Sequence, residues 1–244
     1  MTAPLISIIT PCYNAAASLP TALASLLAQT YSNWECLLID DGSEDDIEKI
    51  VEHVGDERIR FVRLAQNQGR AVARQTALDA ARGEFLCMLD ADDWYYPDKT
   101  RAQLEVMEQN PDISLLSMGM AVIDGENQLL GVRTMRSEET VIKATLDKFD
   151  DLPFGFPPSM IRMEVAREVR FDERLRRSED WDYLNRVLKG RTYGFMTRIG
   201  YAYNDAYSAD AMREAITSFG YHQVVLRDLF WTSPVYIGSK MATT

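Results

Sequence analysis

The stretch Leu86-Cys87-Met88-Leu89-Asp90-Ala91-Asp92-Asp93-Trp94 decides how this chain can fold, because an apolar run ends in three carboxylates. A short, continuous apolar run is typical of a strand that is buried on both faces. Like charges that follow such a strand repel one another unless a cation neutralises them. Carboxylate ligands suit Mg²⁺ or Mn²⁺, which leave coordination positions open for phosphate oxygens. The sequence therefore predicts a buried strand that ends in a divalent-metal site.

An acidic surface turn is the alternative interpretation of Asp90–Asp93, and two further polar clusters weigh against it. Thr10-Pro11-Cys12-Tyr13 follows one apolar run, and Asp40-Asp41-Gly42-Ser43 follows another. Segments with helical spacing of apolar residues separate these runs. This alternation predicts an α/β fold with a mostly parallel sheet that helices cover on both faces. Ligands bind beyond the carboxyl ends of such strands, so the three clusters should meet at one rim.

The expected elements follow from the same patterns. Strands are predicted at 6–10, 35–40, 59–64 and 84–89, and helices at 19–28, 47–53, 71–80 and 97–109. The second half predicts strands at 113–122 and 128–133 around a turn at 124–127, a loop at 145–159 and a helix at 164–169. A last helix is expected to begin after Ser178, which can cap it, and to end at Lys189.

Composition excludes several classes of protein. A chain of 244 residues that is 46% hydrophobic can bury one substantial core, and its net charge of −11 disfavours nucleic acid as a partner. Cys12, Cys36 and Cys87 lie in or beside apolar runs, so we expect reduced core cysteines and a cytoplasmic protein. The uncharged stretch 1–34 lacks a basic leader and is interrupted by polar residues, so we expect neither a signal peptide nor a membrane span.

Six motifs in order resemble the inverting nucleotide-sugar glycosyltransferases of family 2, which have the GT-A fold. The resemblance covers roughly residues 5–190 and is specific because the motifs occur in the family's order. They are Ser7–Asn14, Leu26–Tyr31, Ile39–Ser43, Asn67-Gln68-Gly69 with Ala73-Arg74, Leu89–Asp93, and Phe171–Leu175 with Ser178–Asp182.

The resemblance implies a role for each matching residue. Thr10, Pro11, Tyr13, Asn14, Asp41, Arg74, Asp90 and Ala91 are the implied nucleotide-binding residues. Within that set, Tyr13 would stack on the base and Asp41 would hydrogen-bond to it. Asp92, with Asp90, would bind Mg or Mn, Asp93 would support the metal site, and Asp180 would be the catalytic base. The implied partners are a nucleotide-diphospho-sugar donor, with a UDP-sugar favoured, and a glycan or lipid-linked acceptor.

The absence of a repeat or clear linker predicts one domain, followed by an apolar stretch beyond the part that resembles the family. Residues 1–208 would form a single GT-A domain, with a nucleotide-binding half at 1–110 and an acceptor half at 111–208. Residues 209–244 would form a C-terminal helical extension that packs back onto the domain. Peripheral membrane contact or homo-oligomer formation through this extension is the alternative.

Several interpretations stay open at the level of sequence. Asp41 also suits a turn, and Arg74 also suits a solvated helix face. Trp94 and the loop from Phe154 to Phe156 are candidates for stacking against an acceptor. The metal-associated histidine that many relatives carry near 202–208 is absent, which makes a degenerate nucleotide-sugar-binding or partner-binding domain the alternative function. The turn after the first strand has no glycine-rich phosphate loop, which disfavours nucleotidyltransferases and dinucleotide oxidoreductases.

Overall fold

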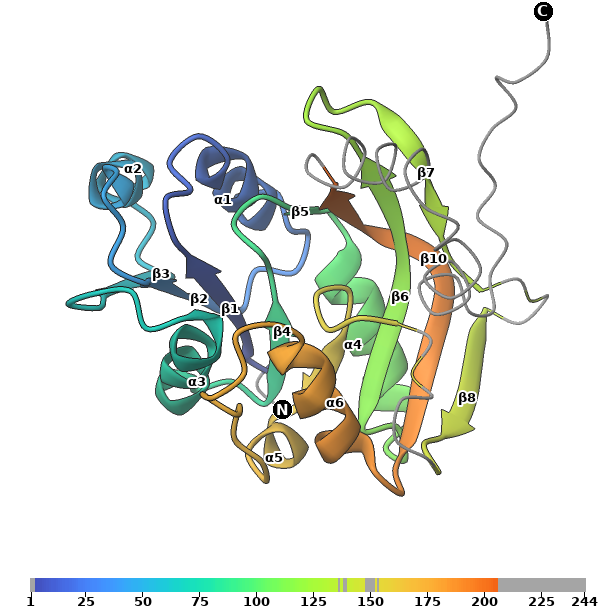
Figure 1. Cartoon of the computed structure of the whole chain (residues 1–244). Coiled ribbons are helices and arrows are strands. Elements are labelled where there is room, and N and C mark those ends of the chain that lie inside the picture. Colours follow the sequence, from blue (N-terminus) through green and yellow to red (C-terminus); the bar gives the residue numbers. More distant parts are fainter. Residues whose placement is uncertain (1–2, 136, 138–139, 148–151, 153, 206–244) are drawn as a thin grey trace, which may run out of the picture.

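The computed structural model describes residues 3–135, 137, 140–147, 152 and 154–205, and Figure 1 shows their arrangement. The predicted C-terminal extension at 209–244 lies outside the described residues. In chain order the elements are β1 Ile6–Cys12, α1 Leu19–Leu27, β2 Trp34–Asp40, α2 Ile47–Val54, β3 Ile59–Arg63, α3 Arg70–Ala80, β4 Phe85–Met88, β5 Trp94–Tyr95, α4 Lys99–Gln109, β6 Leu115–Ile123, β7 Leu129–Arg133, β8 Val141–Thr145, β9 Met160–Arg162, α5 Met163–Ala166, α6 Glu179–Leu188 and β10 Thr192–Asn204.

One ten-stranded sheet organises the described residues, in the order β3-β2-β1-β4-β9-β6-β10-β5, with β7 on β6 and β8 on β10. The β3-β2-β1-β4 half is entirely parallel. The second half is mixed, because β6 and β10 are parallel whereas β5, β7, β8 and β9 pair antiparallel with their neighbours. The predicted α/β class is confirmed, and the parallel character belongs mainly to the first half.

The strands β1, β2 and β4 are buried on both faces, which explains their mainly apolar sequences, whereas the edge strand β3 is partly exposed. Ile8 of β1 and Leu38 of β2 point into a core under α1, α2 and α4. Ile9 and Leu37, one residue away on each strand, point into a second core under α3, α5 and α6. Neighbouring side chains on a strand point to opposite faces, so most positions of these strands are apolar, and buried polar residues such as Ser7 and Glu35 hydrogen-bond to each other. Figure 1 shows the helices on the two sides of the sheet.

The three cysteines confirm the expectation of reduced core residues. Cys12, Cys36 and Cys87 are free and buried in the described structure. Burial raises the pKa of all three thiols, so they are protonated packing residues.

Some local predictions were wrong. Ser178 does precede α6, but its φ of 57° is left-handed and its side chain makes no capping hydrogen bond. The strands β8, β9 and β10 were not predicted as strands. The partner strands of β10 lie far away in sequence, so no local pattern predicts this strand.

Candidate active site

The three polar clusters predicted to meet do share one edge of the sheet. β2, β1 and β4 are adjacent and parallel, with Cys12 opposite Asp40 and Ile9 opposite Met88. Their carboxyl ends therefore lead into the segments after Cys12, Asp40 and Met88 at the same rim. The candidate site is built from these three segments and from the beginning of α6.

The turn after β2 is fixed by its own two aspartates. Asp40 is fully buried, and its Oδ1 accepts hydrogen bonds from the Ser43 amide at 2.9 Å and the Ser43 hydroxyl at 2.5 Å. Asp41 is 3% exposed and accepts backbone hydrogen bonds from Gln68 at 2.7 Å and Gly69 at 2.8 Å. Asp41 thus holds the loop that leads into α3. Its predicted contact with a nucleotide base stays a prediction, because each carboxylate oxygen retains a further lone pair.

Gly42 allows this turn to touch the loop before α3. Its φ is +73°, and a Cβ at this position would lie 2.6 Å from the carbonyl carbon of Gln66. No side chain can occupy that space without moving the backbone of one of the two loops.

We expect Gly42→Ala to lower the free energy of unfolding by about 1–3 kcal/mol through strain and steric clash. Gly190→Ala is the matched control, because Gly190 has nearly the same φ, +71°, with no atom within 4 Å of its Cβ position. Denaturant unfolding of both variants measures the difference. Equal losses of unfolding free energy in Gly42→Ala and Gly190→Ala would show that the two loops are not in close contact.

The residues at the end of β1 and directly after it divide into buried and exposed groups. Thr10 was predicted to hold the base, but it is fully buried and its hydroxyl lies 3.6 Å from the Cys36 thiol that donates to it. Pro11 is likewise buried. Tyr13 is 46% exposed, as a ring that stacks on a ligand requires. Asn14, with φ of 50°, links to the β2 turn because its side-chain oxygen accepts from the Glu44 amide at 2.8 Å.

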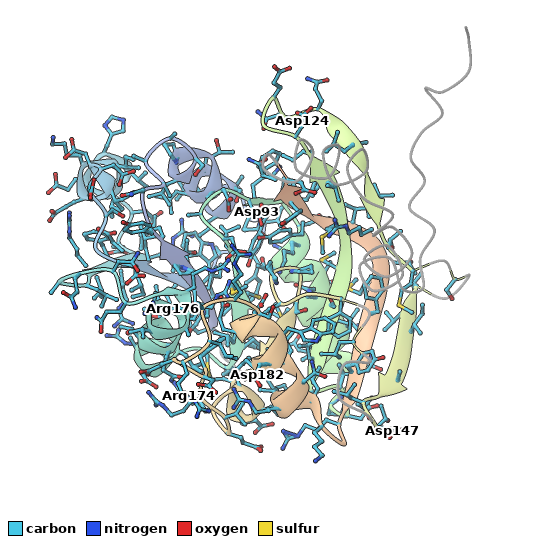
Figure 2. All side chains as sticks on the ribbon, in the orientation of Figure 1. Asp93, Asp124, Asp147, Arg174, Arg176 and Asp182 are labelled. Carbon is cyan, nitrogen blue, oxygen red and sulfur yellow. The ribbon has the colours of Figure 1, made fainter. Side chains whose placement is uncertain are left out.

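The acidic turn after β4 holds its three carboxylates in different environments. Asp90 is half-buried, Asp92 is exposed, and Asp93 is 1% exposed, with Ala91 buried between them. Loss of solvent and the nearby Asp90 raise the pKa of Asp92. Deeper burial, again with Asp90, raises the pKa of Asp93 to about 8. Figure 2 shows Asp93 in the interior of the molecule.

Tyr201 of β10 is a site residue that the sequence did not reveal. Its hydroxyl donates to Asp93 Oδ2 at 2.6 Å and accepts from the Asp90 amide at 3.4 Å, and Tyr201 is itself fully buried. The Asn204 amide donates to Asp93 Oδ1 at 2.7 Å. Asp93 therefore anchors the acidic turn to β10, and its predicted support of a metal site stays a prediction.

We expect Tyr201→Phe to lower the free energy of unfolding by about 1–3 kcal/mol, because a buried carboxyl group loses its hydroxyl partner. Tyr96→Phe is the control, since Tyr96 is 40% exposed and follows β5 directly. Thermal or urea unfolding of the two variants provides the comparison. A Tyr201→Phe variant as stable as the wild type would mean that the Tyr201 hydroxyl does not anchor the turn.

Arg74 of α3 lies between the acidic turn and α6. Its Nη2 donates to Asp90 Oδ1 at 3.2 Å, and its Nη1 donates to Glu179 Oε1 at 2.5 Å. Arg74 and Glu179 are each 1% exposed. The sequence predicted Arg74 beside the nucleotide or on a solvated helix face. The second interpretation was wrong, and the guanidinium instead bridges two carboxylates.

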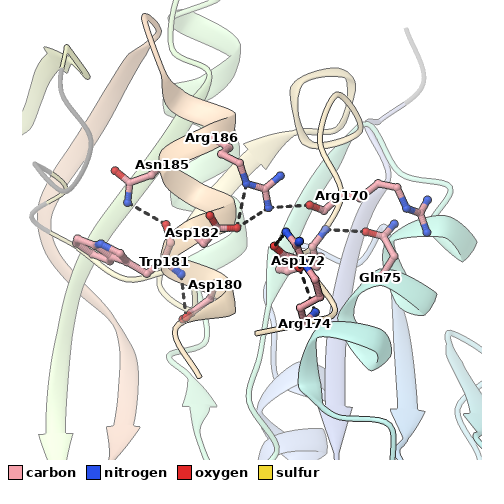
Figure 3. A network of polar contacts seen from close by, with 10 residues as sticks. Gln75, Arg170, Asp172, Arg174, Asp180, Trp181, Asp182, Asn185 and Arg186 are labelled. Atoms are coloured by element: carbon pink, nitrogen blue, oxygen red, sulfur yellow. Dashed lines mark hydrogen bonds and ion pairs between the residues drawn. The ribbon is translucent and has the colours of Figure 1, made fainter. Parts of the chain in front are cut away.

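Asp180, the predicted catalytic base, opens α6 at the same rim. It is half-buried, and its Oδ1 accepts from the Trp181 amide at 2.9 Å (Figure 3). The two carboxylates nearest to it in sequence form ion pairs with arginines. Glu179 pairs with Arg74, and Asp182 pairs with Arg186 at 2.6 Å. The positive end of the helix favours the ionised form of a carboxylate in the first turn. Glu179 and Asp182 thus have arginine partners, and the role of Asp180 as catalytic base stays a prediction.

The proposed aromatic acceptor platform was partly wrong. Phe154 and Phe156 are 6% and 0% exposed. Phe154 packs edge-on against Tyr193 at 5.2 Å between centroids, and Phe156 stacks on Tyr183 at 5.6 Å. Both rings therefore belong to the core under α6. Trp94 is half-buried beside the acidic turn and remains a candidate.

The donor set fits a divalent cation that binds together with phosphate oxygens. Within the described residues, no group of three His, Cys, Asp or Glu side chains forms a preassembled metal site. Asp90 and Asp92 nevertheless provide two neighbouring carboxylates, and loss of solvent together with the charge of Asp90 raises the pKa of Asp92. Mg²⁺ and Mn²⁺ are commonly held by one or two carboxylates and substrate phosphates, so these residues fit such an ion.

The chain belongs to glycosyl transferase family 2, because the model of that family matches residues 7–170, more than half of its length. It is similar to the "UDP-Glc:alpha-D-GlcNAc-diphosphoundecaprenol beta-1,3-glucosyltransferase WfgD" of Escherichia coli, at 38% identity over 52% of this chain and 49% of WfgD. It is also similar to the amylovoran biosynthesis glycosyltransferase AmsB of Erwinia amylovora, at 29% identity over 75% of this chain and 64% of AmsB. The chain thus spans about half the length of WfgD and about two thirds of AmsB.

A structural comparison supports the GT-A fold. The crystal structure of residues 1–349 of TarS from S. aureus in complex with UDP matches 82% of this chain and 60% of that chain, with a TM-score of 0.70 and 22% identity. The same protein has also been solved with UDP-GlcNAc. Across the described residues, no helix is long and apolar enough to cross a membrane.

Proposed function

We propose that this protein transfers a sugar from a nucleotide-diphospho-sugar to an acceptor hydroxyl with inversion at the anomeric carbon. The observation that carries the proposal is that Arg74 joins Asp90 of the acidic turn to Glu179, the residue before Asp180. A candidate donor site and a candidate base therefore lie at one rim. Family membership supports the reaction class.

The donor side consists of exposed and acidic groups of the three strand ends. Tyr13 is available to stack on a base, and Asp41 and Asn14 lie in the interlocked loops beside it. Asp92 and Asp90 would hold the divalent ion, Mg²⁺ or Mn²⁺. Bound there, the ion would stabilise the negative charge on the departing nucleoside diphosphate as a Lewis acid. A UDP-sugar is the favoured donor because WfgD is named for UDP-Glc and TarS was solved with UDP and UDP-GlcNAc.

The acceptor side depends on Asp180. A sugar hydroxyl is a weak nucleophile at neutral pH and needs a carboxylate to take its proton. As the acceptor oxygen bonds to the anomeric carbon, that carbon's bond to the diphosphate oxygen breaks, and the hydroxyl proton moves to Asp180. Attack from the side opposite to the leaving group inverts the configuration. WfgD and AmsB are named for glycan-assembly reactions, which favours a glycan or lipid-linked acceptor.

The test is a screen of nucleoside diphosphates with Mn²⁺ or Mg²⁺ for thermal stabilisation, followed by transfer assays with the corresponding sugars. A ligand that binds the native state raises its apparent stability by mass action. We expect UDP with a divalent ion to raise the melting temperature, and a UDP-sugar to be consumed. Stabilisation without transfer or donor hydrolysis would favour the degenerate binding domain instead.

A further inference from the structure

The cluster formed by Arg74, Glu179 and Asp90 is an unusual feature of this site, because it buries charges from three distant parts of the chain. Arg74 and Glu179 are each 1% exposed. Arg74 reaches Glu179 Oε1 at 2.5 Å and Asp90 Oδ1 at 3.2 Å. Arg70, one helical turn before Arg74 on α3, lies 3.3 Å from the same Glu179 oxygen. One guanidinium therefore joins α3, the end of β4 and the beginning of α6.

Fold stability alone explains this cluster poorly. Removing two charges from water costs free energy that their attraction recovers only with good geometry and satisfied hydrogen bonds. Here Arg74 Nε and Glu179 Oε2 are buried without a hydrogen-bond partner among the described residues. Apolar side chains of similar volume often replace such a pair with no loss of stability. An unsatisfied buried ion pair therefore indicates a role in the site.

The other contacts of α6 act further along the helix. The Tyr183 hydroxyl donates to the carbonyl of Ala166 at 2.6 Å, and its ring stacks on Phe171 with centroids 4.0 Å apart. Arg186 donates to the carbonyl of Arg170 at 2.8 Å, as Figure 3 shows. These contacts hold the middle and end of α6. Glu179, through its ion pair with Arg74, holds the first turn of α6, where Asp180 lies.

We propose that Arg74 and Glu179 are positioning residues, which set the place of Asp180 relative to Asp90 through one buried guanidinium. The planar, rigid fork of arginine can hold two carboxylates in fixed directions, whereas a lysine ammonium cannot. Because Glu179 and Asp180 are consecutive in one helical turn, fixing the first also fixes the backbone of the second. This inference deepens the proposed function and rests on it for the role of Asp180.

The first test is Glu179→Gln, which keeps the side-chain volume and removes the charge. We expect kcat to fall by about 10-fold or more, since small displacements of a catalytic group have large effects on rate. The donor KM and the Kd for UDP with Mn²⁺ should stay within about threefold, because Asp90 and its bond to Arg74 remain. An equal loss in UDP binding, or a wild-type kcat, would overturn the proposal.

Asp182→Asn is the matched control for this variant. It removes a carboxylate from the same first turn of α6, where Asp182 forms a partly exposed pair with Arg186. Exposed ion pairs contribute little to the stability of the folded state. The first turn of α6 should therefore keep its place in this variant, and kcat should stay close to the wild-type value. A fall in kcat equal to that of Glu179→Gln would show that any lost charge in this turn has the same effect.

A second variant separates positioning from folding. Arg74→Met combined with Glu179→Leu removes the pair without leaving either charge alone in the interior. We expect the double variant to melt close to the wild-type temperature while kcat remains reduced. If the double variant has both the wild-type kcat and the wild-type melting temperature, the pair has only a structural role and the proposal is wrong.

Hydrogen exchange provides a readout that does not depend on sugar transfer. In Glu179→Gln the amides in the first turn of α6 should exchange faster, while those near Tyr183 and Leu188 keep their protection. Unchanged exchange in the first turn would overturn the positioning role. Failure of the wild-type protein to consume any nucleotide-sugar would instead refute the proposed function, and the exchange result would still decide the role of Glu179.

Discussion

Asp180→Asn is expected to keep donor and metal binding and to lose sugar transfer by about 10²-fold or more, the scale on which a general base contributes. The amide has nearly the same volume and can still accept the hydrogen bond that the Trp181 amide donates to Asp180. It cannot take a proton from an acceptor hydroxyl. The loss should therefore fall on kcat, with the donor KM little changed.

Three measurements check this expectation: steady-state transfer, UDP binding by calorimetry, and thermal melting. Asp182→Asn should have a much smaller effect, because Asp182 is paired with Arg186 and lies two positions further along the helix. Side chains two residues apart on a helix point in different directions. Transfer by Asp180→Asn at the wild-type rate would place the base elsewhere and refute this mechanism.

Asp92→Asn is expected to abolish stabilisation by UDP with Mn²⁺ and to lower kcat/KM by about 10²-fold or more, because one of the two carboxylates proposed to hold the ion is lost. Without ligands the variant should be at least as stable as the wild type. Loss of solvent around its carboxylate and the nearby Asp90 raise the pKa of Asp92, so a neutral amide at this position removes both unfavourable contributions.

The measurements are melting temperatures with and without UDP, Mn²⁺ and a chelator, together with the transfer rate. Asp46→Asn is the control, because Asp46 is an exposed acid whose pair with Lys49 is also exposed. We expect it to keep both the metal-dependent stabilisation and the activity. Retention of metal-dependent stabilisation by Asp92→Asn would remove Asp92 from the metal site.

The first half of the fold could be predicted from the sequence because its signals are local. Strands that are buried on both faces are mainly apolar, and the helices between them show one apolar face. The predicted strand at 35–40 and helix at 71–80 differ from β2 and α3 by one residue at one end. Since parallel strands end at the same edge, the polar residues after β1, β2 and β4 could be placed at one rim without coordinates.

The environment of each site residue was decided by the tertiary structure. Nothing local distinguishes Thr10, which is fully buried, from Tyr13, which is 46% exposed. Phe154 and Phe156 looked like an exposed loop because of the turn residues around them. Their burial depends on α6 and β10, which come later in the chain.

The sequence by itself determined which residue types stand at the strand ends, and therefore the chemistry available at the rim. Only the tertiary structure decided how those groups are held, because their partners are distant in sequence. Arg74 meets Glu179 across 105 positions, and Tyr201 meets Asp93 across 108. The pairing of such groups depends on how the sheet and helices pack, and that packing also sets the solvent exposure and charge environment of each carboxylate.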